Sequence, residues 1–468
     1  MNPPERLGSS FRDPSGFVFI RAGRIYRQVN PAYRAGYERL MGSGLYEELV
    51  SAGLLIPHRE VSLEDAPGAY RVLEPEALEF VSYPYEWCFG ALRDAALATL
   101  AIQKRAFAHD MLLKDASAYN IQFHHGAPVL IDTLSFARYE EGRPWVAYRQ
   151  FCQHFLAPLA LMSRRDIRLG QLLRIFVDGL PLDLASRLLP RRTWLRFSLL
   201  SHLHLHARSQ QRHAHDMDAP RAVERGRVSR VGLQGLVESL ESAIRGLHWS
   251  PSGTEWGDYY EATNYSREAT AHKGDLVARL LGRVKPATVW DLGANTGVYS
   301  RLALELGAHV VSWDVDPAAV EKSYRQLRRE GPRRLLPLLL DLSNPSAAIG
   351  WANRERMSLA ERGPAELVMA LALVHHLAIS GNVPLDRIAG FLASLGQWLI
   401  IEFIPKSDSQ VERLLRVRED IFTEYTQEGF ERAFDGPFRL VEVEGVRDSE
   451  RRIYLYERRP SAADPGRR

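Results

Sequence analysis

The chain has 468 residues, which is enough for two or three domains, and its 46% hydrophobic and 25% charged residues are ordinary for a globular protein. A formal net charge of +3 provides no concentrated basic surface, so the composition argues against nucleic acid as a partner. The two cysteines, Cys88 and Cys152, are too few for a disulfide framework. No apolar run reaches membrane-spanning length and no signal peptide is recognisable, so we expect a cytoplasmic protein without a membrane partner.

The first predicted elements form an α+β region that extends to about residue 207. A long helix is expected over residues 89–109, followed by Asp115 and Asn120 in an Asp-x-x-x-x-Asn spacing, and an apolar strand then ends at Asp132. This order resembles the catalytic loop and the metal-binding aspartate of protein kinases and aminoglycoside phosphotransferases. The resemblance implies a kinase-like fold in which Asp115 is the base and Asn120 and Asp132 hold the magnesium of a nucleotide.

Two features depart from that family. Leu113 stands where the family has a histidine, and no lysine precedes Lys104 to grip a phosphate. An arginine such as Arg27 replaces a lysine only imperfectly. Three interpretations therefore stay open: a working phosphotransferase, a kinase-like platform that binds a nucleotide or the acceptor of a reaction elsewhere in the chain, and a plain Asp/Asn turn between packed elements.

Histidines gather near the end of this region, at His202, His204, His206, His213 and His215. On a strand, alternate spacing would place three of them on one face, but leucines interleave and neither cysteines nor carboxylates complete a ligand set. A helix on which pairs such as His202 and His206 share a face is the favoured interpretation. We therefore predict no metal here.

Residues 208–230 are rich in polar side chains and poor in large apolar ones, which is typical of a linker or an exposed connection. The sequence thus divides into a domain over 1–207, the linker 208–230, a domain over 231–460 and a tail, 461–468, that we expect to be disordered. Residues 256–265 are rich in aromatic side chains. They predict either a packed aromatic cluster or a segment that covers a cationic ligand.

Short apolar strands alternate with helices through the second domain. The strands are expected at 289–292, 310–313, 335–340, 366–373 and 397–401, and the helices at 298–306 and 318–329. This alternation indicates an α/β fold with a parallel sheet covered by helices on both faces. Two alternating segments, 440–444 and 452–457, predict a final hairpin that adds an antiparallel edge.

A ligand site is predicted where the first three of these strands end. Gly293 and Gly297 allow a close approach to the backbone before a helix N-terminus. Asp314 comes about twenty residues later, where a carboxylate can accept both hydroxyls of a ribose, and Asp341 is placed to meet an adenine amino group. The Asp-x-Gly-x-x-x-Gly pattern differs from that of dinucleotide sites, and an acidic residue there suits a cationic ligand, which favours S-adenosylmethionine over NAD.

On these motifs, residues 256–458 resemble class I S-adenosylmethionine-dependent methyltransferases. The resemblance implies a Rossmann-like, seven-stranded sheet with a reversed last strand. It assigns Asp291, Gly293 and Gly297 to the methionine part of the cofactor, Asp314 to the ribose, Asp341 to the adenine and Tyr265 to a lid. Asn295 occupies a position where the family often has glycine, and asparagine tolerates the left-handed backbone of such a turn.

The next two strands end in candidate proton acceptors. His375 and His376 follow one strand, and the resemblance places this strand end beside the transferred methyl group; we prefer His376 as the base. Glu402 ends the other strand and is a second candidate, as proton acceptor or substrate anchor. The alternatives are a histidine that only packs and a glutamate that only forms a salt bridge to Lys406 or an arginine.

We therefore predict an enzyme that transfers a methyl group from S-adenosylmethionine to an unidentified acceptor. A small molecule is expected, because the chain has neither a basic surface nor the Asn-Pro-Pro-Tyr type motif of amide methylation. The alternatives are a bifunctional methyltransferase and phosphotransferase, which would bind magnesium and ATP through Asp132, and a non-catalytic scaffold, which would turn the cofactor over slowly. The oligomeric state and the acceptor atom stay open.

Overall fold

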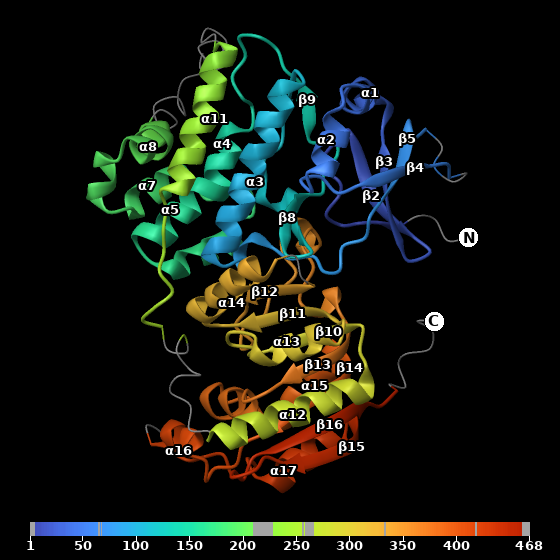
Figure 1. Cartoon of the computed structure of the whole chain (residues 1–468), viewed down its shortest axis with the longest axis vertical. Coiled ribbons are helices and arrows are strands. Elements are labelled where there is room, and N and C mark those ends of the chain that lie inside the picture. Colours follow the sequence, from blue (N-terminus) through green and yellow to red (C-terminus); the bar gives the residue numbers. More distant parts are fainter. Residues whose placement is uncertain are drawn as a thin grey trace. The chain divides into compact units, whose positions relative to one another are not determined.

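A computed structural model describes residues 5–63, 66, 68–208, 228–254, 257, 266–331, 334–416 and 419–460. The chain forms two compact units, drawn in Figure 1. The first unit comprises Met1–Ser250 with Ile349–Arg356, and the second comprises Pro251–Ala348 with Met357–Arg468. Most of the predicted linker and all of the predicted tail lie outside the described residues.

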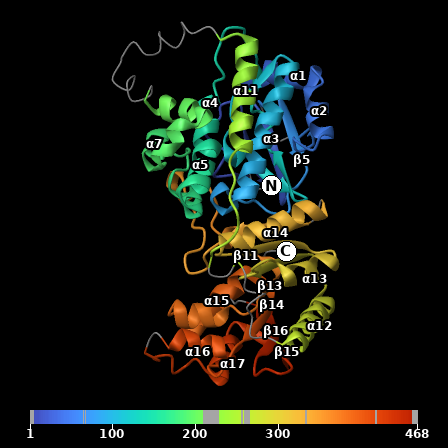
Figure 2. The same cartoon turned by 60° about the vertical axis from the view of Figure 1, so that its left-hand side comes forward.

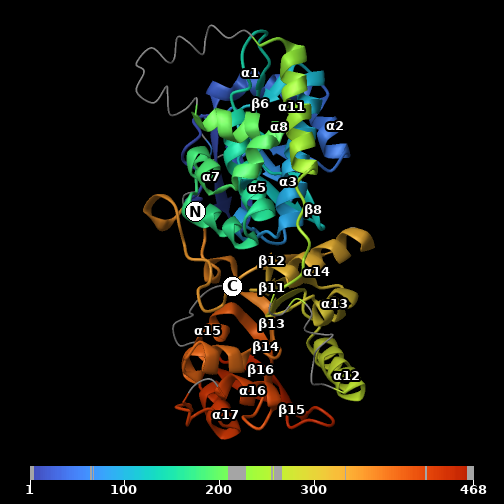
Figure 3. The ribbon, with the colours of Figure 1, turned by 90° about the vertical axis from the view of Figure 1, so that its left-hand side faces the viewer.

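The division between the units differs from the predicted start of the second domain at residue 231. Helix α11 (Arg230–Arg245) belongs to the first unit, where it packs along α3 (Phe89–Ala108), as Figure 3 shows. Its buried face is formed by Leu233, Val237, Leu240, Ala243 and Ile244. This spacing of three and four residues gives one apolar helix face, so the helix needs a partner, and it finds that partner in α3 of the first unit.

The first unit contains a five-stranded antiparallel sheet in the order β1-β2-β3-β5-β4. The strands are β1 (Glu5–Arg6), β2 (Gly16–Arg21), β3 (Arg24–Val29), β4 (His58–Val61) and β5 (Arg71–Pro75). Helices α1 (Arg34–Gly42) and α2 (Leu45–Ser51) lie between β3 and β4 in the chain. Tyr33 and Tyr37 pack with Val29, Leu73 and Leu134 in one buried cluster, so the sheet has an apolar face.

The rest of the first unit is mostly helical and begins with α3, which matches the helix predicted over 89–109. Two short antiparallel pairs follow: β6 (Met111–Leu113) with β9 (Phe136–Arg138), and β7 (Ile121–His124) with β8 (Ala127–Leu130). The later helices are α4 (Tyr148–Phe151), α5 (Ala157–Arg164), α6 (Leu172–Ile175), α7 (Leu182–Leu188), α8 (Phe197–Leu199) and the π-helix η7 (Leu200–Leu205).

The second unit contains a seven-stranded sheet in the order β12-β11-β10-β13-β14-β16-β15. Its strands are β10 (Thr288–Leu292), β11 (His309–Asp314), β12 (Leu335–Leu339), β13 (Ala365–Ala370), β14 (Gly396–Phe403), β15 (Phe438–Gly445) and β16 (Arg452–Arg458). The first five strands of this order are parallel, whereas β16 runs antiparallel to both β14 and β15. The predicted seven-stranded α/β sheet, with the last strand of the chain reversed, is therefore confirmed. The predicted antiparallel edge is wrong: β16 is the reversed strand and lies inside the sheet, so β15 at the edge, which pairs antiparallel to β16, runs parallel to the other five strands.

Helices cover both faces of this sheet. Figure 2 shows α12 (Arg267–Val284) and α13 (Val298–Glu305) on one side, and α15 (Leu385–Leu395) and α17 (Gln427–Asp435) on the other. Helices α14 (Pro317–Glu330) and α16 (Ser409–Leu415) complete the unit. Buried side chains of α12 and α13 share a core with apolar residues of the strands, such as Val289, Leu367 and Leu455. In the part of the chain described here, no helix is both long and apolar enough to cross a membrane.

Candidate functional site

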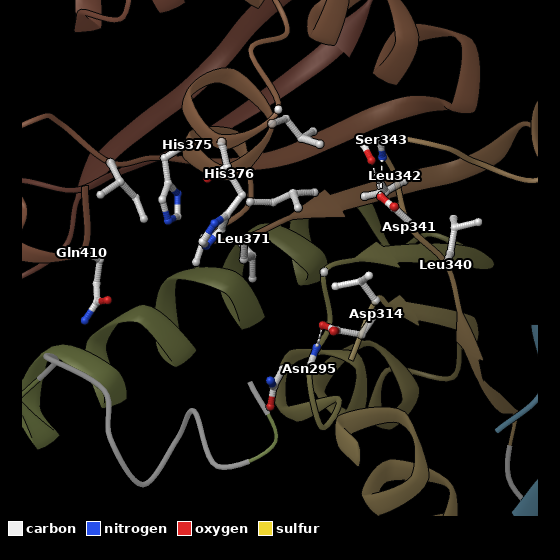
Figure 4. A pocket seen from close by; sticks show the side chains of 18 of the residues that line it. Asn295, Asp314, Leu340, Asp341, Leu342, Ser343, Leu371, His375, His376 and Gln410 are labelled. Carbon is white, nitrogen blue, oxygen red and sulfur yellow. Dashed lines mark hydrogen bonds between the residues drawn. The ribbon is translucent and has the colours of Figure 1, made fainter. Parts of the chain in front are cut away.

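A cavity of about 350 Å³ lies at the carboxyl ends of the parallel strands in the second unit (Figure 4). In an open α/β sheet this edge is where ligands bind, because the loops that follow the strands converge there. Six residues predicted from the sequence line the cavity: Gly293, Asn295, Asp314, Asp341, His375 and His376. The structure thus brings together residues from the ends of four strands.

The turn after β10 lines one wall of the cavity with backbone atoms. Gly293 has φ 74° and Asn295 has φ 50°, so both residues adopt the left-handed conformation. A Cβ on Gly293 would stand 3.2 Å from Leu373 Cδ1, which is closer than ordinary van der Waals contact. The amides of Gly293 and Ala294 both donate to Trp313 O at 2.9 Å, which fixes the turn to the neighbouring strand. Because glycine has no Cβ, the backbone at position 293 stays accessible to a ligand.

Asp314 ends β11 and lies next to Asn295 in Figure 4. Its Oδ2 accepts the amide of Asn295 at 2.7 Å, and its Oδ1 accepts the amide of Asp316 at 2.8 Å. Burial raises the pKa of Asp314 to about 6, although these amide hydrogen bonds act in the opposite direction. A carboxylate oxygen can accept more than one hydrogen bond, so both oxygens can still receive ligand hydroxyls.

Asp341 follows β12 and lies on the same side of the cavity, next to Ser343 (Figure 4). The Ser343 amide donates to Asp341 Oδ1 at 2.8 Å, and the Ser343 hydroxyl donates to the same oxygen at 2.6 Å. These bonds fix the orientation of an otherwise exposed carboxylate. Its place at the rim of the cavity fits contact with a polar group of the ligand.

His375 and His376 line the opposite part of the cavity, on the same side of the view as Gln410 in Figure 4. The rings are 4.0 Å apart between centroids. Burial lowers the pKa of His376 to about 4, and burial with the nearby positive groups lowers the pKa of His375 well below its usual value. Both rings are therefore neutral at neutral pH. The Nδ1 atom of His375 is buried and has no hydrogen-bond partner among the described residues.

Three predicted site residues do not line the cavity: Asp291, Gly297 and Glu402. Asp291 is buried behind the turn, where it accepts the Ser300 hydroxyl at 2.6 Å, and burial raises its pKa to about 7. Gly297 has φ 79° and is the N-cap residue directly before helix α13. Tyr265 and most of the predicted lid lie outside the described residues.

Glu402 forms a buried ion pair instead of facing a ligand. Its side chain is 0% exposed, and Lys273 Nζ lies 2.6 Å from its Oε2 atom. The same oxygen accepts the amide of Ala372 at 2.8 Å. Burial lowers the pKa of Lys273 even though Glu402 opposes that shift. The alternative of a salt bridge describes this side chain: Lys273 is the nearest partner, and Arg451 Nη1 lies 3.9 Å from Oε1, as the prediction of an arginine partner allowed. Lys406 pairs instead with Asp420 at 2.8 Å.

Glu402, the acid of this ion pair, also stabilises a turn that lines the cavity. Ala372 lines the cavity and has φ 50°, a conformation that costs a residue with a Cβ about 1 kcal/mol. Its amide bond to Glu402 holds that strained turn in place. Arg451 also lines the cavity, and its guanidinium donates to both Asp408 oxygens, at 2.7 and 3.0 Å.

Sequence reasoning missed Arg451 and Gln410 as cavity residues. Gln410 is the second residue of α16, and its amide donates to the side chain of Asp408, which caps that helix. Both residues reach the cavity through packing between distant segments, and neither sits in a recognisable motif. The only local sign is an arginine directly before the last apolar strand.

In the first unit, the structure brings Asn120 and Asp132 together around one hydroxyl. Ser135 Oγ donates to Asp132 Oδ2 at 2.6 Å, and Asn120 Nδ2 donates to Ser135 Oγ at 3.4 Å. Arg27 places its guanidinium 2.6 Å from Asp132 Oδ1. Asp115 accepts the amide of Ser117 at 2.9 Å, as in an Asx turn. Asp132 therefore has internal partners on both oxygens.

The described histidines of the predicted cluster, His202, His204 and His206, lie on a helix, as favoured, and the first two contact hydroxyl groups. His202 contacts Tyr148 Oη at 2.8 Å and Ser239 Oγ at 2.9 Å. His204 contacts Ser186 Oγ at 2.7 Å and Thr193 Oγ1 at 2.9 Å. With both ring nitrogens engaged in each case, these side chains stabilise the packing of the first unit. His213 and His215 lie outside the described residues.

No family model matches the chain. The nodulation protein NoeA of Rhizobium meliloti (strain 1021) is 36% identical to it over 462 residues, which is 97% of this chain and 96% of that protein. Among solved structures, the magnesium protoporphyrin IX methyltransferase ChlM from Synechocystis PCC 6803, with bound SAH, has a TM-score of 0.29 and 18% identity over 41% of this chain and 84% of its own. The N-methyltransferase NodS from Bradyrhizobium japonicum WM9 has a TM-score of 0.30 and 11% identity over 41% of this chain and 98% of its own.

Proposed function

The chain belongs to the family of the nodulation protein NoeA, and we propose that it is a methyltransferase that uses S-adenosylmethionine. The observation that carries this proposal is the cavity at the carboxyl ends of the seven-stranded sheet, lined by Gly293, Asp314 and Asp341. The relative's name connects that protein with nodulation but states no reaction. We propose that this chain also acts in nodulation, and we infer the reaction from the residues that line the cavity.

The residues present fit this cofactor. Glycine at position 293 leaves room where a Cβ would crowd Leu373, so a ligand can approach the backbone. Two carboxylates, Asp314 and Asp341, follow neighbouring strands and can accept hydroxyl and amino protons of a nucleoside. Among the described residues that line the cavity, Arg451 is the one arginine or lysine, and its charge is already balanced by Asp408. This balance suits a cofactor without phosphate.

In this proposal, S-adenosylmethionine supplies an electrophilic methyl group bonded to a sulfonium. Asp314 accepts the ribose hydroxyls, Asp341 meets the adenine, and the turn at Gly293 and Asn295 supports the methionine part. His376 is the proposed base: it is neutral at neutral pH, lines the cavity and is less buried than His375. His376 would accept a proton from the nucleophilic atom of the acceptor as that atom bonds to the methyl carbon.

The acceptor is proposed to be a small molecule. The part of the cavity near His376 is also lined by Ser380, Ile404 and Gln410, which together offer a hydroxyl, an apolar surface and an amide. Such a mixed lining is typical of sites for small organic ligands, where a few polar groups set the orientation. Asp291 and Gly297 would act by shaping the first turn of α13, and Glu402 by holding the turn at Ala372.

For the first unit we propose a kinase-like fold. Its support is the long helix α3 followed by the loop of Asp115 and Asn120, and the convergence of Asn120 and Asp132 on Ser135. The Arg27 guanidinium neutralises Asp132 and competes with a metal ion for that carboxylate. We therefore place the reaction of this protein in the second unit and treat phosphate transfer as the weaker candidate.

The function is tested by incubating the purified chain with a small-molecule extract and S-adenosylmethionine that carries a deuterated methyl group. We expect mass spectrometry to show one labelled methyl group on at least one compound, and no such product with the His376→Gln variant. If no compound gains the label while S-adenosylhomocysteine still binds, the chain is a cofactor-binding scaffold and the proposed enzyme activity is wrong.

Binding of S-adenosylhomocysteine should depend on pH through Asp314. Its pKa of about 6 means that the carboxylate is ionised at pH 7.5 and mostly protonated at pH 5. If only the ionised form accepts both ribose hydroxyls, the dissociation constant should rise about tenfold between these pH values. A raised carboxyl pKa also means that protonation at Asp314 favours the folded state, so this weakening would not reflect unfolding caused by that residue. Calorimetric titration at both pH values measures the change, which should vanish in Asp314→Asn.

A further inference from the structure

A second cluster of ionisable side chains lies in the first unit, far in sequence from the cofactor cavity. It combines His124 and His125, at the turn between β7 and β8, with Glu76 and Glu79, which follow β5. One ligand atom each from Glu76, His124 and His125 lies within 4.8 Å of the others. None of these residues takes part in the proposed methyl transfer.

The backbone holds the two imidazoles side by side. His124 pairs with Ala127 across the hairpin, so His125 and Gly126 form a two-residue turn. Their φ values of 50° and 77° are those of a type I′ turn, which twists in the same sense as the strands and is rigid. The rings lie 3.9 Å apart between centroids. A non-glycine residue at positive φ is uncommon, and here it directs a second histidine toward the first.

The two glutamates play different parts around these rings. Glu79 places one oxygen 3.2 Å from His124 Nδ1 and the other 3.3 Å from His125 Nδ1. Glu76 places Oε1 3.4 Å from His124 Nε2, and its amide donates to Pro57 O at 2.9 Å, which anchors the residue. A carboxylate that accepts the second N–H of an imidazole fixes the ring and its tautomer, which is the usual surrounding of a metal-binding histidine.

We propose that Glu76, His124 and His125 bind a divalent transition-metal ion of the zinc class, with Glu79 as the carboxylate that positions both rings. Ligands of a tetrahedral zinc ion, at about 2.0–2.1 Å from the metal, stand about 3.3–3.4 Å from one another. The separation of 3.4 Å between His124 Nε2 and Glu76 Oε1 has that size. Two imidazoles and a carboxylate select zinc, cobalt or nickel over magnesium and calcium, which prefer oxygen ligands.

The ion would connect the β7–β8 hairpin to the segment after β5. Three protein ligands leave the fourth tetrahedral position for water. Glu76 is exposed and His125 is partly exposed, so solvent can reach that position. The site would therefore exchange metal readily and would stabilise the first unit through its preference for the folded state. It does not depend on the methyltransferase proposal, because all four residues belong to the first unit.

Titration of the metal-free full-length chain with zinc chloride in a calorimeter tests this site. We expect His125→Asn, which keeps a residue tolerant of positive φ, and Glu76→Gln each to weaken zinc binding at this site at least tenfold. Glu79→Gln should weaken it by about tenfold as a positioning residue. The control is His248→Ala, which removes an exposed histidine elsewhere in the first unit and should leave binding unchanged.

A second measurement protects the test against a variant that fails to fold. Zinc should raise the unfolding temperature of the wild-type chain and of His248→Ala, but not that of His125→Asn, whose circular dichroism without metal should equal that of the wild type. Cobalt bound to the wild type should show the visible absorption of a tetrahedral site. Equal zinc affinity in the wild type and His125→Asn, or no zinc binding by the wild type, would overturn the proposal.

Discussion

Replacing Asp314 by alanine should abolish tight binding of S-adenosylmethionine and S-adenosylhomocysteine. The variant removes the carboxylate that is proposed to accept two ribose hydroxyls, and a hydrogen bond to a charged group contributes about 1.5–3 kcal/mol. Losing two such bonds predicts a dissociation constant raised by at least about 100-fold. The amides of Asn295 and Asp316 would also lose their acceptor, so the turn beside the cofactor should loosen. Calorimetric titration with S-adenosylhomocysteine measures the effect directly.

A matched control separates this loss from a general effect of removing an aspartate. Asp275 is an exposed residue of α12, and Asp275→Ala should bind S-adenosylhomocysteine as the wild type does. The unfolding temperature of Asp314→Ala without ligand should be measured in parallel, because a buried carboxylate with a raised pKa is not itself a stabilising charge. Wild-type affinity in Asp314→Ala would remove the ribose assignment and, with it, the main support for the proposed cofactor.

The largest effect on stability is expected from breaking the ion pair between Lys273 and Glu402. Lys273→Met removes the nearest cation from a carboxylate that is 0% exposed and leaves Arg451 Nη1 3.9 Å from its other oxygen. Removing one partner of a buried pair costs about 3–5 kcal/mol, and the remaining arginine places the expected loss near the lower end of that range. The double variant Lys273→Met, Glu402→Leu should recover much of that loss, since an apolar pair of similar volume is often as stable as a buried ion pair. Hydrogen exchange followed by mass spectrometry on peptides of β13 and β14 reports the local free energy of opening.

Lys406→Met provides the matched control for this ion pair. The substitution is the same, but Lys406 and Asp420 are side chains with 30% and 45% exposure, and such a pair is worth about 0–1 kcal/mol. The recovered stability of the double variant need not restore the site, because the Ala372 amide would still lack its acceptor. If Lys273→Met lowered the free energy of opening no more than Lys406→Met, the buried ion pair would not stabilise the wall of the cavity.

The five parallel strands of the second unit were predictable from the sequence, because each is a short apolar run. The place of the final hairpin in the sheet was not, because the strand that β16 pairs with is far away in the chain. The turn at Gly293 and the acids at Asp314 and Asp341 were also predictable, since their positions depend only on local chain geometry at strand ends. Glu402 was not. It resembles Asp314 as a carboxylate that follows buried strand residues, and what separates the two is Lys273, a partner 129 residues away in the chain. Long-range pairing of this kind leaves no local pattern.

Long-range contacts also explain what could not be predicted in the first unit. The Asp-x-x-x-x-Asn spacing predicted a cluster, and the structure connects Asn120 to Asp132 through Ser135, which no motif had marked. The apolar face of α11 was readable from its spacing of three and four residues, yet the residue at which the first unit ends depends on what that face packs against. Periodicity predicts that a face is buried, but not which neighbour buries it.

The assignment of Ile349–Arg356 to the first unit has a consequence for dissecting the gene. Glu355 in this segment pairs with Arg12 at 2.7 Å, and Arg356 stacks over the Tyr119 ring at 4.1 Å. The polypeptide therefore enters the second unit, returns to the first and leaves it again. A truncation after Ser250 would remove eight residues from the first unit and leave them without their partners in the other fragment. An exchange of whole units would therefore have to join the chain at three junctions, 250/251, 348/349 and 356/357.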